Sequence, residues 1–346
     1  MLAPTLFFAG LLALAQPVFS RPVVKANDVA VMARKYLSKR APAGPKIGGA
    51  NFPDPAIIGV NNRWYAFATR TMGGNVHIQV AESADFESWS MVQNGDGSQK
   101  DALPNLPGWV DEGNSNTWAP DVHALDDGTF VMYYSATTRQ NAALHCVGVA
   151  TSNTITGPYT PAGDEALICP LDQGGAIDAS VFNNNGQRWI TWKVDGNAIG
   201  NGGICGNTVE PIKPTPLRLQ RLSASGTSLV GSATTILDNN GASDQGLIEA
   251  PALLNHAGTW FLFFSANCYT TEQYNVAYAT ASSVTGPYTR AGRPLFQTGD
   301  MGLVAPGGGD AAQDGRHFAF HAREGTNGDR AMYTALLNFD GNTVSA

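Results

Sequence analysis

One sequence unit recurs five times along the 346 residues, and this repetition restricts the possible folds more than any other feature. The unit opens with an acidic residue near a small residue or proline, then passes through an aliphatic stretch, a turn, two strand-like runs and a Gly-Pro-Tyr-type element. The second and fourth copies are the most alike, with VGVATSNTITGPYTPAG corresponding to VAYATASSVTGPYTRAG. The five openings are Pro53-Asp54-Pro55-Ala56, Ala119-Pro120-Asp121-Val122, Ile177-Asp178-Ala179-Ser180, Ile248-Glu249-Ala250-Pro251 and Ala305-Pro306-Gly307-Gly308.

The repeats predict an all-β fold, a five-bladed β-propeller with about four antiparallel strands in each blade. Short runs of β-branched and aromatic residues, such as 63–69 and 259–266, are bounded by turn residues and indicate strands rather than helices. In a propeller the first strand of each blade lines the central axis, so the unit openings should converge there although they lie 57–71 residues apart in sequence. A β-sandwich or another two-sheet β domain is the alternative.

Charge and composition narrow the range of ligands. The formal net charge is −7, which argues against binding to nucleic acid, because phosphate recognition needs clustered lysine and arginine. Charged residues make up only 14% of the chain, and 39 residues are glycine. A turn-rich β protein that handles neutral ligands fits this composition.

The N-terminal region predicts secretion. Residues 2–15 are an apolar run too short to span a bilayer comfortably and typical of a signal peptide, which we place at residues 1–20. We expect residues 21–40, which end in Lys39-Arg40, to be a short pro-segment; a helix with a solvated charged end is the alternative. Residues 46–346 then form one propeller domain. No other stretch predicts a membrane span.

Four cysteines in a secreted chain suggest two disulfides, for which three pairings are possible. Cys146 lies in a strand-like run and Cys169 follows one hairpin later, which favours a bond between them. Cys205 and Cys268 both follow strand-like runs, and we expect them to form the second bond.

Three of the unit openings carry a carboxylate in apolar or small-residue surroundings. These are Asp54 in NFPDPAI, Asp178 in GGAIDASVF and Glu249 in GLIEAPALL. A single buried acid is usually structural, but acids gathered in one cleft shift one another's pKa values. Two carboxyl groups, one protonated and one ionised, are what glycoside hydrolysis requires. The sequence therefore predicts a glycosidase site on the propeller axis.

These motifs resemble those of glycoside hydrolase family 43, five-bladed propeller enzymes that cut arabinans, arabinoxylans and xylosides. The resemblance covers roughly residues 46–346. It is carried by Phe52-Pro53-Asp54-Pro55, Thr117-Trp118-Ala119-Pro120-Asp121, Ile177-Asp178-Ala179-Ser180 and Ile248-Glu249-Ala250-Pro251, in that order.

The resemblance implies a role for each acid. Asp54 matches the general base that activates a water, and Glu249 matches the general acid that protonates the leaving oxygen. Asp178 matches the third acid, which raises the pKa of the general acid and holds it in place. The family inverts anomeric configuration, and inversion predicts that the Asp54 and Glu249 carboxyls lie about 6.5–9.5 Å apart.

Other site residues are expected around these acids. Trp118 is expected to stack on a sugar, Phe52 to wall the subsite beside the base, and Arg323 to bond sugar hydroxyls. His321 matches a histidine that in many relatives faces a metal or water cluster, so the resemblance implies a structural calcium at the propeller centre. No cofactor is expected for the chemistry itself. The fifth opening lacks a histidine that relatives often carry there.

The third unit contains a long insertion at residues 195–216. Insertions on the active face usually shape the pocket. A loop pinned there by Cys205–Cys268 is expected to close one end of the cleft and to favour exo cleavage.

The sequence thus predicts a secreted, inverting glycoside hydrolase that acts as a monomer on a plant polysaccharide or oligosaccharide. The main prediction is release of α-L-arabinofuranosyl units from arabinan or arabinoxylan, and β-xylosidase activity of the same family is the alternative. A non-catalytic sugar-binding propeller, a lectin, is the alternative from another class. Neither nucleic acid nor a membrane is expected as a partner.

Overall fold

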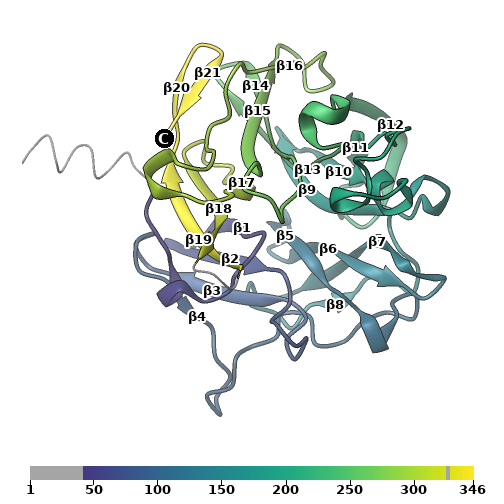
Figure 1. The fold of residues 1–346 in the computed structure, drawn as a ribbon. Helices are drawn as coiled ribbons and strands as arrows, with labels where there is room; N and C mark the ends of the chain where they lie inside the picture. Colours follow the sequence, from purple (N-terminus) through teal and green to yellow (C-terminus); the bar gives the residue numbers. More distant parts are fainter. Residues whose placement is uncertain (1–41, 325–327) are drawn as a thin grey trace, which may run out of the picture. The chain divides into compact units, whose positions relative to one another are not determined.

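The computed structural model describes residues 42–324 and 328–346, so the predicted signal peptide and pro-segment lie outside the described residues. Within these residues the chain forms five main β-sheets and a C-terminal hairpin (Figure 1). None of the described helical turns is long and apolar enough to cross a membrane. These 3-10 turns are Ile47–Gly49, Glu112–Asn114, Leu171–Gln173, Gly196–Ile199, Ile204–Gly206, Gly241–Asp244 and Asp300–Gly302.

Each of the first four sheets has four antiparallel strands, and each corresponds to one sequence unit. The first blade contains β1 (Ala56–Val60), β2 (Arg63–Ala68), β3 (Gln79–Ser83) and β4 (Ser90–Met91). The second contains β5 (Trp118–Ala124), β6 (Phe130–Thr138), β7 (Asn141–Ser152) and β8 (Thr160–Pro161). The third contains β9 (Ala176–Asn184), β10 (Gln187–Val194), β11 (Leu217–Leu222) and β12 (Leu229–Leu237). The fourth contains β13 (Ile248–His256), β14 (Thr259–Ala266), β15 (Asn275–Ala281) and β16 (Thr289–Arg290).

The fifth blade has three strands from the end of the chain and borrows its outer edge from the beginning. Its own strands are β17 (Gly307–Ala311), β18 (His317–Glu324) and β19 (Asp329–Leu336), followed by the hairpin β20 (Asn338–Asp340) and β21 (Thr343–Ser345). The segment 43–52 runs along β19, where the Ala43 amide donates to the Thr334 carbonyl at 2.7 Å and the Phe52 amide donates to the Arg330 carbonyl at 2.8 Å.

The first strands of the five blades contact one another in a closed cycle. Contacts join β1 to β5, β5 to β9, β9 to β13, β13 to β17, and β17 back to β1. The predicted five-bladed propeller is therefore confirmed, and the five unit openings do converge on its axis.

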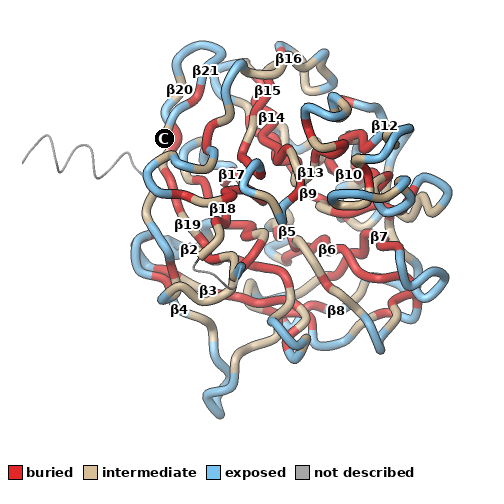
Figure 2. Tube along the Cα trace, viewed as in Figure 1, coloured by how far each residue is buried: buried red, intermediate tan, exposed pale blue. Residues whose placement is uncertain are grey.

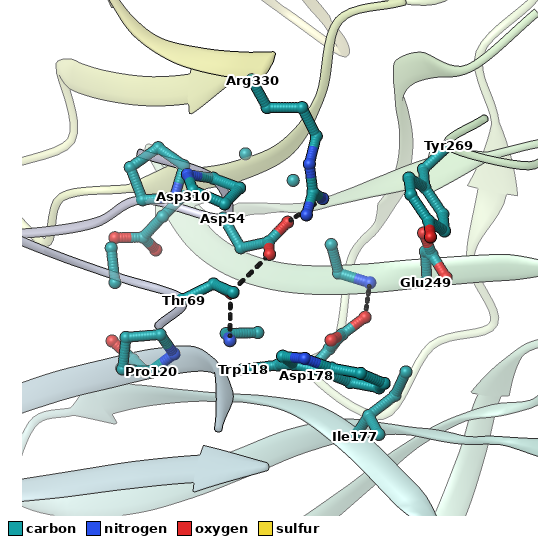
Figure 3. A pocket seen from close by; sticks show the side chains of 18 of the residues that line it. Asp54, Thr69, Trp118, Pro120, Ile177, Asp178, Glu249, Tyr269, Asp310 and Arg330 are labelled. Atoms are coloured by element: carbon teal, nitrogen blue, oxygen red, sulfur yellow. Dashed lines mark hydrogen bonds and ion pairs between the residues drawn. The ribbon is translucent and has the colours of Figure 1, made fainter. Parts of the chain in front are cut away.

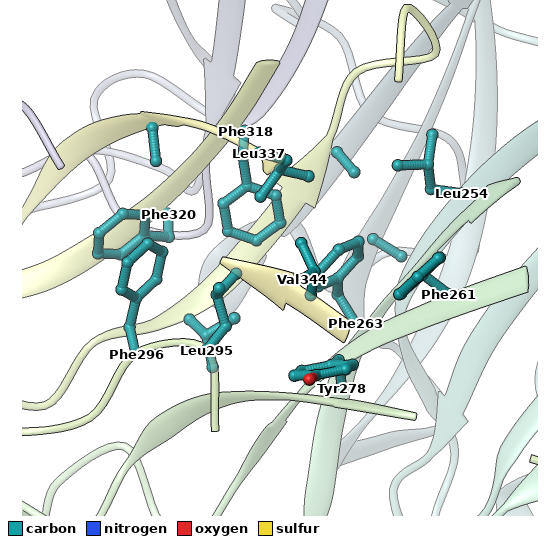
Figure 4. Close-up of a cluster of buried hydrophobic side chains, with 14 of the residues drawn as sticks. Leu254, Phe261, Phe263, Tyr278, Leu295, Phe296, Phe318, Phe320, Leu337 and Val344 are labelled. Atoms are coloured by element: carbon teal, nitrogen blue, oxygen red, sulfur yellow. The ribbon is translucent and has the colours of Figure 1, made fainter. Parts of the chain in front are cut away.

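Apolar side chains fill the space between adjacent blades, and burial follows the strands while the connecting loops are exposed (Figure 2). The cluster between the fourth and fifth blades is rich in phenylalanine and is covered by Val344 of the terminal hairpin (Figure 4). Flat aromatic rings suit the narrow layer between two twisted sheets, because they bury a large area in little depth. Its labelled members include Phe261, Phe263, Phe318 and Phe320.

A left-handed residue opens every blade, and we call these five the seam residues. They are Asp54, Ala119, Asp178, Ala250 and Gly308, with φ between 41° and 57°. The backbone amide of each donates a hydrogen bond to a side chain of the preceding blade. The acceptors are His321 Nδ1, Thr69 Oγ1, Ser135 Oγ, Asp178 Oδ2 and Ser265 Oγ, in that order, at 2.9–3.1 Å.

The seam residues correct one detail of the repeat alignment. Asp54 and Asp178 are equivalent, but Glu249 lies one residue before its seam residue, Ala250, and Asp121 lies two residues after Ala119. The register shows the offset: Glu249 pairs with Ser265 as Ile177 pairs with Lys193, so Glu249 is equivalent to Ile177 and Ala250 to Asp178. Asp121 accepts the Val181 amide at 2.6 Å and thus links two blades.

Both predicted disulfides are present. Cys146 of β7 bonds to Cys169, and Cys205 of the insertion bonds to Cys268, which lies in the loop after β14. The second bond fixes the insertion to the loop that carries Tyr269, on the face where the unit openings meet.

Candidate active site

A cavity of about 450 Å³ opens where the blades meet, and residues of all five blades line it. Asp54, Asp178 and Glu249 all contribute to its wall (Figure 3). Asp54 precedes β1, Asp178 lies in β9 and Glu249 lies in β13. Residues that are more than sixty positions apart in sequence therefore face one space because each opens a blade.

Asp54 is surrounded by hydrogen-bond donors and one cation. Its Oδ2 accepts the Thr69 hydroxyl at 2.6 Å, and its Oδ1 lies 3.3 Å from Arg330 Nη1 (Figure 3). Burial alone would raise the pKa of Asp54, but Arg330, His321 and Thr69 outweigh burial and lower the pKa below its ordinary value. The Asp54 carboxyl is therefore ionised at neutral pH and can accept a proton.

Asp178 and Glu249 behave as a pair of interacting acids. Asp178 Oδ2 accepts the Ala250 amide at 2.9 Å, which ties it to the strand that carries Glu249. Burial and the neighbouring Glu249 carboxylate raise the pKa of Asp178 to about 8. Asp178 therefore retains a proton at neutral pH, next to Glu249.

Both oxygens of Glu249 have a partner. Oε1 accepts the Tyr274 hydroxyl at 2.8 Å, and Oε2 accepts Lys193 Nζ at 3.0 Å. Lys193 is almost wholly buried, with 1% of its side chain exposed, and its ammonium also lies 3.0 Å from Asp195 Oδ1. The Glu249 side chain is therefore held in one place by groups from two other segments.

Aromatic residues border the acids. Trp118 lines the cavity, and its ring stacks on the imidazole of His145 with 3.8 Å between ring centroids. Burial lowers the pKa of His145 to about 4, so this supporting ring is neutral. Tyr269 also lines the cavity and lies beneath the Arg330 guanidinium, whose carbon is 5.0 Å from the ring centroid. Trp118 thus lines the same cavity as the three acids, and its stacking on a sugar stays a prediction.

Two of the expected binding residues lie elsewhere. Phe52 has no exposed surface and packs in the core between the first and fifth blades, because its segment lies along β19, where the Phe52 amide donates to the Arg330 carbonyl. Arg323 donates to the Tyr269 carbonyl at 3.1 Å and does not line the cavity. Arg330, seven residues later on β19, occupies the place expected for Arg323.

The structural calcium expected near His321 stays a prediction. The Asp54 amide donates to His321 Nδ1 at 3.1 Å, and among the described residues the buried Nε2 has no hydrogen-bond partner. Burial lowers the pKa of His321 to about 3 and keeps the ring neutral. Among the described residues, no cluster of three or more His, Cys, Asp or Glu side chains has a geometry that holds a metal. The contact that the structure shows for His321 is with Asp54, which it helps to position.

The structure also reveals site residues that the sequence did not single out: Thr69, Lys193, Tyr274 and Arg330. Each acts on an acid that belongs to another strand, so no short motif contains both partners. Lys193 left only a weak signal, since the strand-like run RWITWKV at 188–194 carries two charged residues, Arg188 and Lys193, and the sequence does not distinguish them.

Comparison with known proteins agrees with this geometry. Residues 47–339 match the family described as glycosyl hydrolases family 43. The chain is 29% identical to a probable arabinan endo-1,5-alpha-L-arabinosidase C of Aspergillus flavus, over 79% of this chain and 82% of that protein. It is 26% identical to extracellular endo-alpha-(1->5)-L-arabinanase 1 of Bacillus subtilis, over 82% of each chain.

Solved structures share the fold. A thermostable family-43 glycoside hydrolase superposes with a TM-score of 0.71 and 23% identity, over 88% of this chain and 95% of that one. A GH43 endo-arabinanase from Bacillus licheniformis gives a TM-score of 0.66 and 24% identity, over 87% of this chain and 99% of that one.

Proposed function

This chain belongs to glycosyl hydrolases family 43, and from that premise we propose that it is a secreted arabinanase that hydrolyses α-1,5-linked L-arabinofuranosyl residues by inversion. Arabinan is favoured over xylosides because both of the curated relatives described above are named as arabinan-cleaving proteins. Secretion is supported by the relative named as extracellular and by the apolar N-terminal run.

The observation that carries the proposal is the opposite charge state of the acids in one cavity. Asp54 is held ionised by Arg330, whereas burial and the neighbouring Glu249 raise the pKa of Asp178 to about 8, so that this carboxyl holds a proton at neutral pH. A base and an acid that face one cleft and differ in charge at the same pH are what a single displacement needs.

The reaction then runs in one step. Asp54 takes a proton from water while the water oxygen forms a bond to the anomeric carbon. The bond from that carbon to the leaving oxygen breaks, and Glu249 gives that oxygen its proton. Asp178 supports Glu249 through its bond to the Ala250 amide, which fixes the strand that carries Glu249.

Trp118 is proposed to stack on a sugar next to the scissile bond. Its indole ring is supported from behind by His145 and lines the cavity in front. The apolar face of a pentose presents C–H bonds, which suit an aromatic surface.

The test is hydrolysis of debranched arabinan, linear arabino-oligosaccharides, and the aryl glycosides of α-L-arabinofuranose and β-D-xylopyranose. We expect turnover of the arabinosides, with loss of about 10²–10⁴-fold in Glu249→Ala and retained sugar binding. Release of arabinose alone would support the exo action expected from the 195–216 loop, and a ladder of oligosaccharides would indicate endo action. Turnover of the xyloside alone, or sugar binding without turnover, would overturn the proposal.

A further inference from the structure

In each blade, one equivalent position in or just after the second strand carries a side chain that faces the opening of the next blade. Register across the bulges pairs Trp118 with Ser135, Ile177 with Lys193, Glu249 with Ser265 and Gly307 with His321. The first blade uses Thr69, whose amide donates to the Pro53 carbonyl. The five equivalent residues are thus Thr69, Ser135, Lys193, Ser265 and His321.

Four of these five residues have the same role, and Lys193 of the third blade is the exception. Thr69, Ser135, Ser265 and His321 each accept the backbone amide of the following seam residue. A lysine ammonium has three donors and no acceptor, so Lys193 cannot take that role. In the third blade, Asp178 accepts the seam amide instead, and Lys193 is free to turn its ammonium toward Glu249.

A buried lysine at such a position is costly unless it serves a purpose. Lys193 exposes 1% of its side chain, and removing an ammonium from water carries a large penalty. Two carboxylates compensate for that penalty, Asp195 at 3.0 Å and Glu249 at 3.0 Å. Positions where one copy of a repeat breaks the rule obeyed by the others are where function is expected.

We propose that Lys193 is a positioning residue for proton donation: its ammonium holds the Glu249 carboxyl in place and stabilises the carboxylate that remains after Glu249 has protonated the leaving oxygen. This inference rests on the proposed role of Glu249 as general acid. In the step, the O–H bond of Glu249 breaks, its proton bonds to the leaving oxygen, and the negative charge stays on Glu249 beside the Lys193 cation.

Several charged groups besides Lys193 influence the ionisation of Glu249. Removing a cation from beside an acid disfavours the ionised form and therefore raises its pKa. Removing an anion such as Asp195, which also pairs with Lys193, should have the opposite effect and favour the ionised form of Glu249. The groups that face the site are Asp178 on β9, Asp195 after β10, Tyr274 before β15, Asp54 before β1, Arg330 on β19 and His145 on β7, which lies near Asp195.

The test compares substrates that differ in their need for a proton. In Lys193→Met, we expect kcat on an arabino-oligosaccharide to fall by about 10²-fold, because its leaving alcohol must be protonated. Turnover of 2,4-dinitrophenyl α-L-arabinofuranoside should change little, because its leaving group departs without a proton. The alkaline limb of kcat/KM should move to higher pH by about one unit.

A second variant should shift the alkaline limb of kcat/KM in the opposite direction. Asp195→Asn removes the anion that competes with Glu249 for Lys193, so this limb should move to lower pH. Lys193→Ser installs the residue that the second and fourth blades carry at this position, and should fold even if the methionine variant does not. Arg188→Met removes another buried cation of β10, which pairs with Asp126 outside the main cavity, and should leave the pH profile unmoved.

The outcomes separate the inference from the proposed function. Equal losses on both substrates, or an alkaline limb that does not move in the folded Lys193 variants, would overturn the inference. One outcome is that Glu249→Ala loses far more activity on the oligosaccharide than on the dinitrophenyl substrate while the Lys193 variants lose equally on both. In that case the proposed function stands and the role of Lys193 is wrong. If wild type cleaves no pentoside, the proposed function itself fails.

Discussion

At the scale of single residues, the ionised state of Asp54 depends on a partner from the opposite end of the chain. Arg330 lies 3.3 Å from Asp54 Oδ1 although 276 residues separate the two in sequence. The cation lowers the pKa of Asp54 against the opposing effect of burial. Activity at low pH should therefore be set by Arg330 as much as by Asp54.

Substituting Arg330 tests this dependence. In Arg330→Met the pKa of Asp54 should rise, and because the base works only when ionised, the acidic limb of kcat/KM should move to higher pH by about one unit. The measurement is the pH profile on an aryl arabinofuranoside. Arg323→Met is the matched control, since among the described residues the Arg323 side chain donates to the Tyr269 carbonyl and not to Asp54, and its acidic limb should not move. An unmoved limb in Arg330→Met would show that Arg330 does not tune the base.

Sequence predicted the three acids but not their partners, and the reason is physical. Asp54, Asp178 and Glu249 each sit in a repeated motif, so their spacing revealed them. Lys193 and Arg330 lie on other strands, and only the register between strands brings them to the acids. Phe52 was misplaced because its proximity in sequence to Asp54 does not reveal that it bonds to β19 and packs in the core.

At the scale of the strand, the seam position combines a left-handed backbone with a hydrogen bond between blades. Ala119 and Ala250 show that alanine tolerates this backbone here, so conformation alone does not require the glycine at 308. The lack of space requires a glycine there, because a Cβ at Gly308 would lie 2.6 Å from the His321 ring and 2.8 Å from Asp54 Oδ1.

Gly308→Ala should therefore affect both stability and catalysis. Overpacking of this kind costs about 1–3 kcal/mol, and the displaced groups are Asp54 and its support His321. We expect a lower Tm and a lower kcat, measured by thermal unfolding and by steady-state kinetics. Ala119→Gly is the control, and its free energy of unfolding should stay within about 1 kcal/mol of wild type. Wild-type kcat in Gly308→Ala would contradict the tight fit described here.

The loop pinned by Cys205–Cys268 provides a second test at this scale. Cys268 directly precedes Tyr269, which lines the cavity, and the bond closes a separation of 63 residues. The double variant Cys205→Ser/Cys268→Ser should lose about 2–4 kcal/mol of unfolding free energy. Well below its Tm, KM for an arabino-oligosaccharide should rise more than kcat falls, because Tyr269 is less well held. An unchanged KM would mean that the loop does not shape substrate binding.

At the scale of the whole molecule, the ring is closed by the two ends of the described chain. The segment 43–52 supplies the outer edge of the fifth blade through backbone bonds to β19. Gly44 is part of this closure, since a Cβ there would lie 2.4 Å from the Tyr333 ring. The predicted processing site at Lys39-Arg40 precedes all of these contacts, so cleavage there would remove none of them.

Truncation checks this closure. A chain that begins at Ala41 keeps all of these contacts and serves as the reference. A chain that begins at Phe52 should unfold at a clearly lower temperature, because the fifth blade then loses its outer strand. Thermal unfolding of both proteins, monitored by circular dichroism, gives the comparison. Equal Tm values for the two truncated chains would show that the segment does not close the ring.

The fold was predictable at this scale because repeats report architecture directly. Five similar units, each too small to bury its own apolar face, can only stack on one another, and a closed ring satisfies every edge. The contribution of the N-terminal segment to the fifth blade was not predictable, because residues 43–52 resemble none of the repeated strands.

The central claim is that Asp54 and Glu249 act across one bond in a single displacement, and the configuration of the first product tests it most directly. Proton NMR of an α-linked arabino-oligosaccharide, recorded in the first minutes of hydrolysis, reports the anomer before mutarotation. The account predicts that β-L-arabinofuranose forms first. Initial appearance of the α anomer would contradict it, since retention requires a covalent intermediate and two carboxylates closer together.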